Sequence, residues 1–246
     1  MSWRVLVTSL FLAFSVLAFA KATRPRRALL PGAALTPQAE MEAIALRVRQ
    51  WVDYVAEADR VAAAQQERWA QQEQQVRIER ETLNAAAVRF LDAQVRGAGE
   101  ALAKRKRVPQ LVDAVIAGVE ARVTQGQWVP LSRAKAPAFL LAVSFHESSW
   151  DAWDRGGPTG ARGERCSFQV HPSTLWALGF TEAQVAADFR VCLTAAIRAM
   201  ETCAQSCGSN PAEGFMSCYA TGGSCSGARD VVDARFRTAR QLLAAQ

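Results

Sequence analysis

The sequence contains little of what metal and nucleotide enzymes use. Its 246 residues include two histidines, His146 and His171, and neither stands at a zinc-finger spacing. No C-x-x-C pair, phosphate-binding loop, dinucleotide fingerprint or Ser-His-Asp order occurs. We therefore expect no metal site and no cofactor. Apolar residues make up 50% of the chain and charged residues 21%, which predicts a sizeable core and excludes disorder over most of the length.

Cysteine is absent from the first 165 residues, and all six cysteines lie between Cys166 and Cys225. An even number in so short a segment favours disulfides, and hence an oxidising compartment outside the cytoplasm. A zinc site is a weaker alternative, because Cys203 and Cys207 are four residues apart and Cys218 follows. Free buried thiols are a third interpretation. The pairing of the disulfides stays open at this point.

The N-terminal segment has the composition of an export signal. The run from Val5 to Ala20 carries no charge and ends on a small-x-small pattern, typical of a signal-peptidase site. We interpret residues 1–22 as a signal peptide or, as the alternative, a membrane anchor, followed by a proline-containing linker over 23–37. Four positive residues follow the apolar run and only Arg4 precedes it. By the positive-inside rule this distribution favours keeping the downstream part of the chain in the cytoplasm, which conflicts with export. The cysteines favour export, and we give them more weight, although the two signals still conflict; we expect an exported protein of the cell envelope.

The net charge of +6 belongs to the N-terminal part. Residues 1–108 hold 17 Lys and Arg against 11 Asp and Glu, whereas residues 109–246 hold 12 of each. The excess lies in two clusters, one over 21–27 and one over 104–107. A solvated linker is the first interpretation, and contact with anionic lipid or an acidic polymer is the alternative. Nucleic acid is not expected, since no recognition motif and no aromatic residue accompany the clusters.

Residues 38–96 contain neither glycine nor proline, which predicts one long helix. One column at heptad spacing is apolar throughout, and the second turns polar in its middle. A strong coiled coil needs both columns apolar, so we predict a helical stalk that acts as a spacer or associates weakly with another copy. The apolar column contains Val48, Val55, Ala62, Trp69, Val76, Leu83 and Phe90. Residues 97–108 are interpreted as a basic hinge.

A new helix is predicted to begin at Pro109, a residue favoured in the first turn of a helix. After Pro137 comes a run that is apolar nearly all round, which is typical of the buried central helix of a domain. Glu147 stands where this run ends. Desolvation and the negative end of the helix dipole both raise the pKa of a carboxyl group at such a place. A protonated carboxyl group is what a glycosidase needs as its general acid. Taken alone, Glu147 fits a solvent-exposed residue at a helix end at least as well.

Three short motifs follow one another in order. They are Glu147-Ser148, then Cys166-Ser167-Phe168-Gln169-Val170 with His171-Pro172-Ser173-Thr174, and then Cys218-Tyr219-Ala220-Thr221-Gly222. Together they resemble the superfamily of SLT lytic transglycosylases and goose-type lysozymes, whose motifs are Glu-Ser, Gly-Leu-Met-Gln-Ile and Ala-Tyr-Asn-x-Gly. The resemblance covers about residues 109–241.

The resemblance implies a role for each matching residue. Glu147 would be the acid/base and Ser148 would support the site by hydrogen bonding. Gln169 and the backbone near Ser167 and Phe168 would line the glycan groove, as would Gly222. Tyr219 would hydrogen-bond near Glu147 and hold it in place. The chain departs from the family at Cys166, where glycine is expected, and at Ala220, where the expected asparagine and its substrate contact are lost.

The reaction type depends on a second carboxylate. The resemblance implies that a lytic transglycosylase needs one glutamate, because the substrate's C6 hydroxyl attacks and leaves a 1,6-anhydro end. A hydrolase needs a base that activates water. Glu164 is the best candidate for that base, since the cations around it favour its ionised form. Asp151 and Asp154 are interpreted as solvated loop residues. The single-glutamate route is slightly favoured.

The aromatic residues near Glu147 carry less specific expectations. His146 is expected to pack beside the cleft without a catalytic role. Trp150, Trp153 and Trp176 suit sugar stacking and core packing equally.

The sequence therefore predicts a mainly α-helical fold. A lysozyme-like domain over 109–246, with a small β-like or irregular lobe, would follow the helical stalk. Its expected function is cleavage of the MurNAc–GlcNAc β-1,4 bond of peptidoglycan, and glycan strands are its expected partner. A non-catalytic murein-binding protein with the same fold is one rival hypothesis. A coiled-coil scaffold capped by this domain is another.

Overall fold

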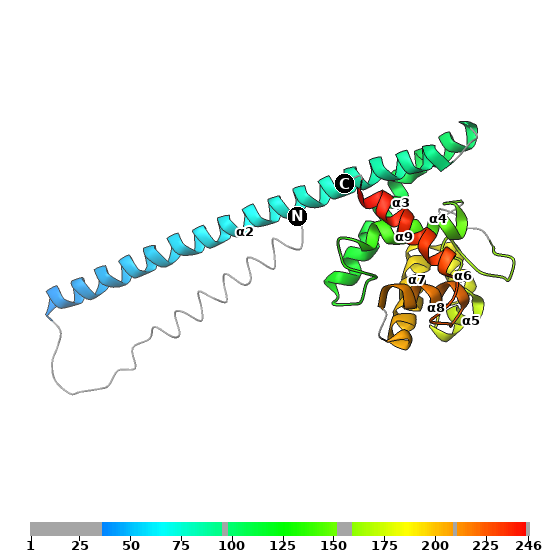
Figure 1. Ribbon diagram of the computed structural model, residues 1–246. Coiled ribbons are helices and arrows are strands. Elements are labelled where there is room, and N and C mark those ends of the chain that lie inside the picture. Colours follow the sequence, from blue (N-terminus) through cyan, green and yellow to red (C-terminus); the bar gives the residue numbers. More distant parts are fainter. Residues whose placement is uncertain (1–35, 95–97, 152–158, 209–210, 245–246) are drawn as a thin grey trace. The chain divides into compact units, whose positions relative to one another are not determined.

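The computed structural model describes residues 36–94, 98–151, 159–208 and 211–244 (Figure 1). The export segment, most of the predicted linker, Trp153 and Asp154 lie outside these ranges. The described residues are mainly helical and contain no strand, which confirms the mainly α prediction. A single isolated bridge joins Arg165 and Val170. Among the helices described, none has the length and apolar character needed to cross a membrane.

The chain divides into two units, residues 1–66 and residues 67–246. Helix α2, Pro37–Gln94, contributes to both. Its part in the first unit exposes a series of large apolar side chains, namely Met41, Ile44, Leu46, Val48, Trp51, Val52 and Val61. The predicted stalk helix is thus present, and its association with another copy stays a prediction.

The second unit contains the remaining helices. They are α3 (Ala98–Thr124), α4 (Ala136–Ser148), α5 (Pro172–Ala177), α6 (Glu182–Ala187), α7 (Phe189–Cys207), α8 (Pro211–Thr221) and α9 (Arg229–Ala244). In Figure 1 helices α4 to α9 gather into one cluster. The core also includes the end of α2, where Leu83 and Leu91 are buried and Phe90 packs edge-on against Phe145 at 4.8 Å between ring centroids.

The predicted hinge over 97–108 is wrong. Helix α3 begins at Ala98 and runs through Pro109, which lies inside it. Lys104 is not a solvated linker residue, since its side chain is 5% exposed and its Nζ lies 2.9 Å from Asp151 Oδ1. Proline inside a helix removes one backbone hydrogen bond. Buried Val108 and Leu111 on either side anchor the helix to the core and hold it across this position.

Helix α4 is the central helix that the apolar run predicts. Proline lies in its first turn, and its residues from Ala138 to Val143 are fully buried. Burying side chains such as Phe139 and Leu140 contributes about 1.5–3 kcal/mol each. The helix ends because Ser149 and Trp150 adopt left-handed backbone conformations, with φ of 54° and 58°. Glu147 therefore stands in the last turn of a buried helix, as expected.

All six cysteines form disulfides, which confirms that prediction. The pairs are Cys166–Cys192, Cys203–Cys218 and Cys207–Cys225. Each pair has one cysteine in α7, and the other belongs to the 165–170 turn, to α8 or to the loop after α8. Helix α7 is thus the common support of these three segments. Within the described residues, no group of three or more His, Cys, Asp or Glu side chains could hold a metal ion.

Candidate active site

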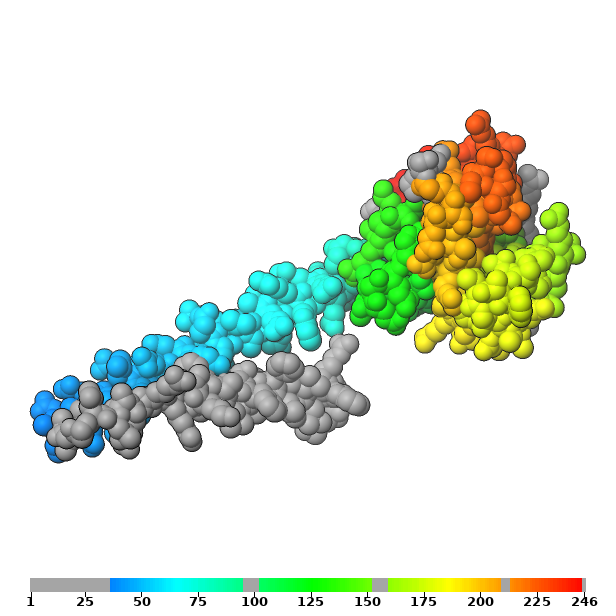
Figure 2. All heavy atoms as spheres, turned by 90° about the horizontal axis from the view of Figure 1, so that it is seen from below, coloured from blue at the N-terminus to red at the C-terminus, as the bar shows by residue number. Residues whose placement is uncertain are grey.

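A pocket of about 900 Å³ opens at the end of α4. Its walls come from the 160–178 segment, from α7 and from α8 with the loop that follows it. Figure 2 shows the 160–178 segment in yellow-green and α8 in orange on one face of the molecule. Five of the predicted site residues line this pocket together: Glu147, Glu164, Gln169, Tyr219 and Gly222. They come from three separate parts of the chain, α4, the 160–178 segment and α8 with the loop after it, so the fold brings together residues that lie far apart in the sequence.

Glu147 is a largely buried carboxyl group. Its side chain is 17% exposed. Burial raises the pKa of Glu147 above the ordinary value, and the negative charge of Glu164 adds to the rise. The neighbouring guanidinium of Arg235 opposes this effect by favouring the charged form. The net direction is upward because desolvation outweighs the opposite charge.

Arg235 is a site residue that the sequence analysis missed. Its Nη2 donates a hydrogen bond to Glu147 Oε1 and forms an ion pair with it, while Nη1 donates to the Val231 carbonyl at 3.0 Å. The side chain is 7% exposed. One signal could have found it. In α9 the buried positions follow helical spacing, and Arg235 lies on that stripe together with Val232, Thr238, Ala239 and Leu242.

Glu164 has the opposite electrostatic environment. Hydrogen bonding from backbone N–H groups, first its own and then that of Arg162 at 2.8 Å, lowers the pKa of its carboxyl group. The positive charge of Arg162 lowers it further. Two carboxyl groups in one pocket, one with a raised and one with a lowered pKa, suit the roles of acid and base.

Gly160 leaves the space that Glu164 and Gln169 occupy. A Cβ atom added to Gly160 would lie 2.3 Å from Glu164 Oε2 and 2.3 Å from Gln169 Oε1. The two oxygens therefore converge on one point beside the main chain. The Gly160 N–H also donates to the Glu164 carbonyl at 2.8 Å, and Gln169 Nε2 donates to the Cys166 carbonyl at 2.8 Å. The first bond holds the Glu164 backbone beside Gly160, and the second orients the Gln169 side chain in the pocket wall.

The 165–170 turn carries Gln169 into the pocket. Backbone hydrogen bonds of 3.0 Å run both ways between Arg165 and Val170. Cys166 and Gln169 both take left-handed conformations, with φ of 64° and 50°. Cys166, at the position where the resemblance leads us to expect glycine, therefore has a glycine-like backbone conformation. The Cys166–Cys192 disulfide ties the turn to α7.

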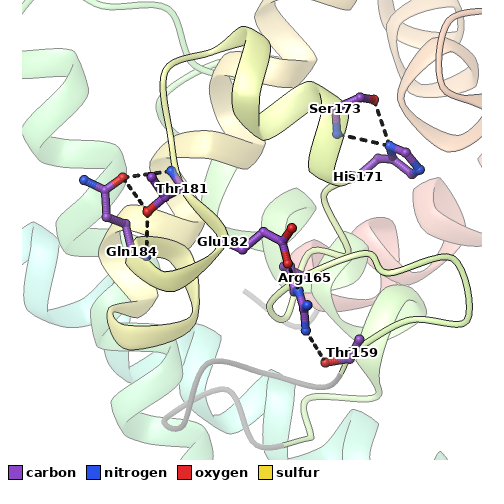
Figure 3. Close-up of polar contacts among 7 residues, drawn as sticks. All are labelled: Thr159, Arg165, His171, Ser173, Thr181, Glu182 and Gln184. Atoms are coloured by element: carbon purple, nitrogen blue, oxygen red, sulfur yellow. Dashed lines mark hydrogen bonds and ion pairs between the residues drawn. The ribbon is translucent and has the colours of Figure 1, made fainter.

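Polar contacts also hold the segments on either side of the 165–170 turn in place (Figure 3). Arg165 bonds Thr159 and forms an ion pair with Glu182. His171 is the N-cap of α5, because its Nδ1 accepts the Ser173 N–H. These contacts connect the segment before the turn with the helices after it.

Tyr219 has a different hydrogen bond from the one predicted. Its hydroxyl donates to the Phe168 carbonyl at 2.7 Å and does not hold Glu147. Burial raises the pKa of Tyr219 far above the ordinary value, and the negative charge of Glu147 adds to the rise, so the two residues are neighbours. Tyr219 holds the 165–170 turn in place, because the carbonyl it reaches belongs to that turn.

Three other predicted residues, Ser148, Ser167 and Phe168, are not among those that line the pocket. Ser148 Oγ donates to the Ser144 carbonyl at 2.9 Å, so its bond stays inside α4. Phe168 is fully buried in the core, and Ser167 is buried beside it. Of the polar residues in the 165–170 turn, Gln169 is the one that lines the pocket.

The aromatic and acidic neighbours of Glu147 also have defined places. Trp150 is 2% exposed and donates to the Leu141 carbonyl, so it packs in the core and does not face a sugar. Trp176 is 83% exposed. Asp151 is in the ion pair with Lys104 and is not part of the pocket. His146 Nε2 bonds Thr238 Oγ1 at 2.9 Å, which fits the expected packing role.

Comparison with other proteins gives no match: no family model, no curated protein and no solved structure is similar to this chain.

Proposed function

We propose that the chain cleaves the MurNAc–GlcNAc β-1,4 bond of peptidoglycan, with Glu147 as general acid/base. The observation that carries this proposal is the buried carboxyl group of Glu147, with its raised pKa, in a pocket that also contains the more exposed carboxylate of Glu164. A general acid of this kind contributes about 10²–10⁴-fold to the rate. The motif resemblance supports glycan strands as the substrate class.

Two reaction routes are compatible with this pocket, and we favour the lytic transglycosylase over the hydrolase. A lytic transglycosylase is the first candidate, because Glu147 alone can donate the proton and later receive one from the C6 hydroxyl. Hydrolysis is the second candidate, and one observation favours it. The lowered pKa of Glu164 keeps a carboxylate ionised in the same pocket, where it could activate water.

The location and partner follow from the same proposal. Three disulfides in one domain favour an oxidising compartment, and murein is found outside the cytoplasm. We therefore place the protein in the cell envelope or periplasm, with glycan strands as its partner.

Product analysis tests the function. The full chain is incubated with purified peptidoglycan, and the released muropeptides are identified by mass spectrometry. Anhydro ends indicate a transglycosylase and reducing ends a hydrolase. Glu147→Gln should release no products, whereas Glu213→Gln, which removes an exposed carboxylate of α8, should match the wild type. Binding of murein with no products from the wild type would contradict the enzyme and support the non-catalytic binding protein.

A further inference from the structure

Helix α9 holds the end of α4 through two polar contacts one turn apart. Arg235 pairs with Glu147, and Thr238 hydrogen-bonds His146 at 2.9 Å. Residues three apart in a helix lie on the same face, so α9 presents both groups to consecutive residues of α4. Helix α4 ends at Ser148, directly after Glu147, so the hydrogen bonds within α4 do little to fix the Glu147 side chain. The orientation of the Glu147 side chain therefore depends on α9.

The burial of Arg235 is difficult to explain by stability alone. Removing a guanidinium from water is costly, and a buried ion pair is often no more stabilising than apolar residues of the same volume. Within the described part of the chain, the buried Nε of Arg235 has no hydrogen-bond partner. Its other nitrogens are held by Glu147 and the Val231 carbonyl. Among the described residues, the charged group that pairs with this side chain is Glu147, the proposed acid.

We propose that Arg235 is the positioning residue of Glu147: it holds the carboxylate in one orientation and stabilises the charged form that remains after proton donation. This inference rests on the proposed function. In the first step, the proton of Glu147 moves to the glycosidic oxygen while the bond from that oxygen to C1 breaks and its electron pair stays on the oxygen. Glu147 is then a carboxylate in a largely buried site, and Arg235 supplies the opposite charge there.

The titratable and charged groups around Glu147 come from several elements, and Arg235 and Glu164 act on its charge. Arg235 faces it from α9, Tyr219 from α8 and Glu164 from the loop before the turn, and His146 precedes it in α4. Of these, Arg235 lowers the pKa of Glu147 and Glu164 raises it. Removing the Arg235 charge should therefore raise the pKa of Glu147, because the charged carboxylate then loses the guanidinium that stabilises it.

The test measures the titration of Glu147 directly and through activity. Carbon-13 NMR of the Glu147 side-chain carboxyl in the full chain needs no substrate. Arg235→Gln should move its titration upward by about 1–3 pH units. Arg235→Lys keeps the charge and should move it less. Arg235→Met fills the same volume without charge, so it should show the shift even if Arg235→Gln folds poorly. Arg240→Gln, an exposed arginine on the same helix, is the matched control and should leave the titration unchanged.

The activity profile adds a second readout. Muropeptide release by Arg235→Gln should fall at least tenfold at neutral pH, and its alkaline limb should move upward with the NMR titration. A Glu147 titration that is the same in Arg235→Gln, Arg235→Met and the wild type would overturn the inference. A titration that moves while the wild type releases no muropeptides would support the positioning role and overturn the proposed function.

Discussion

Gly160→Ala should separate the chemistry of the pocket from the stability of the fold. The added Cβ would lie 2.3 Å from Glu164 Oε2 and from Gln169 Oε1, whereas ordinary contacts begin at 3.4 Å. Each side chain must therefore retreat by about 1 Å. If Glu164 activates water, as on the hydrolytic route, a displacement of that size in a reacting group can cost about 100-fold in rate. On the transglycosylase route Glu164 does not react, and the loss should come only from the displaced Gln169 wall of the pocket. The two oxygens are the ends of flexible side chains and move easily, and Glu164 Cβ, at 3.0 Å, must give by only a few tenths of an ångström, so the free energy of unfolding should change by less than about 1 kcal/mol.

The assay compares the rate of muropeptide release with urea unfolding for the same preparation. Gly163→Ala is the matched control, because Gly163 has φ of +83° and its added Cβ would meet only Pro172 Cγ at 3.7 Å. This control should lose about 1–2 kcal/mol through backbone strain and keep a rate near the wild type. The reasoning is refuted if Gly160→Ala cleaves murein at the wild-type rate, or if its rate falls only in proportion to a loss of folded protein.

Two further predictions concern the support of the pocket walls. Tyr219→Phe removes the bond to the Phe168 carbonyl and should lower the free energy of unfolding by about 1–3 kcal/mol, as measured by urea denaturation; an unchanged midpoint would mean that Tyr219 does not anchor the turn. Replacing both Cys203 and Cys218 by alanine opens a loop with a sequence separation of 15 residues and should cost about 3 kcal/mol. Thiol titration of the unfolded variant should find no free thiol, and two free thiols would show that the other four cysteines pair differently.

Several parts of the site could be predicted because they depend on local patterns. An apolar run that stops at Glu147 specifies both a buried helix and a carboxyl group at its end, since burial follows from hydrophobicity. The cysteine count indicates disulfides in the same way. The long helix over most of 38–96 follows from the absence of glycine and proline, and α2 occupies Pro37–Gln94.

The wrong predictions share one cause. Pro109 was assigned to a helix start by its local preference, but the buried residues on both sides of it keep α3 continuous. The resemblance implies a hydrogen bond of Tyr219 near Glu147, but in the structure the Tyr219 hydroxyl donates to the Phe168 carbonyl. For Ser148 it implies only a supporting hydrogen bond, and that bond goes to the Ser144 carbonyl within α4. Local preference is weak wherever tertiary packing offers a competing contact.

By itself, the sequence determined the helical class, the oxidised cysteines and the place of Glu147 in a buried helix, because composition and periodicity control burial directly. Only the tertiary structure decided which groups surround that carboxyl. Arg235 is 88 residues away along the chain, and Glu164 reaches the pocket only because Gly160 leaves room for it. The pKa of Glu147 depends on these distances in space, and no spacing along the sequence specifies them.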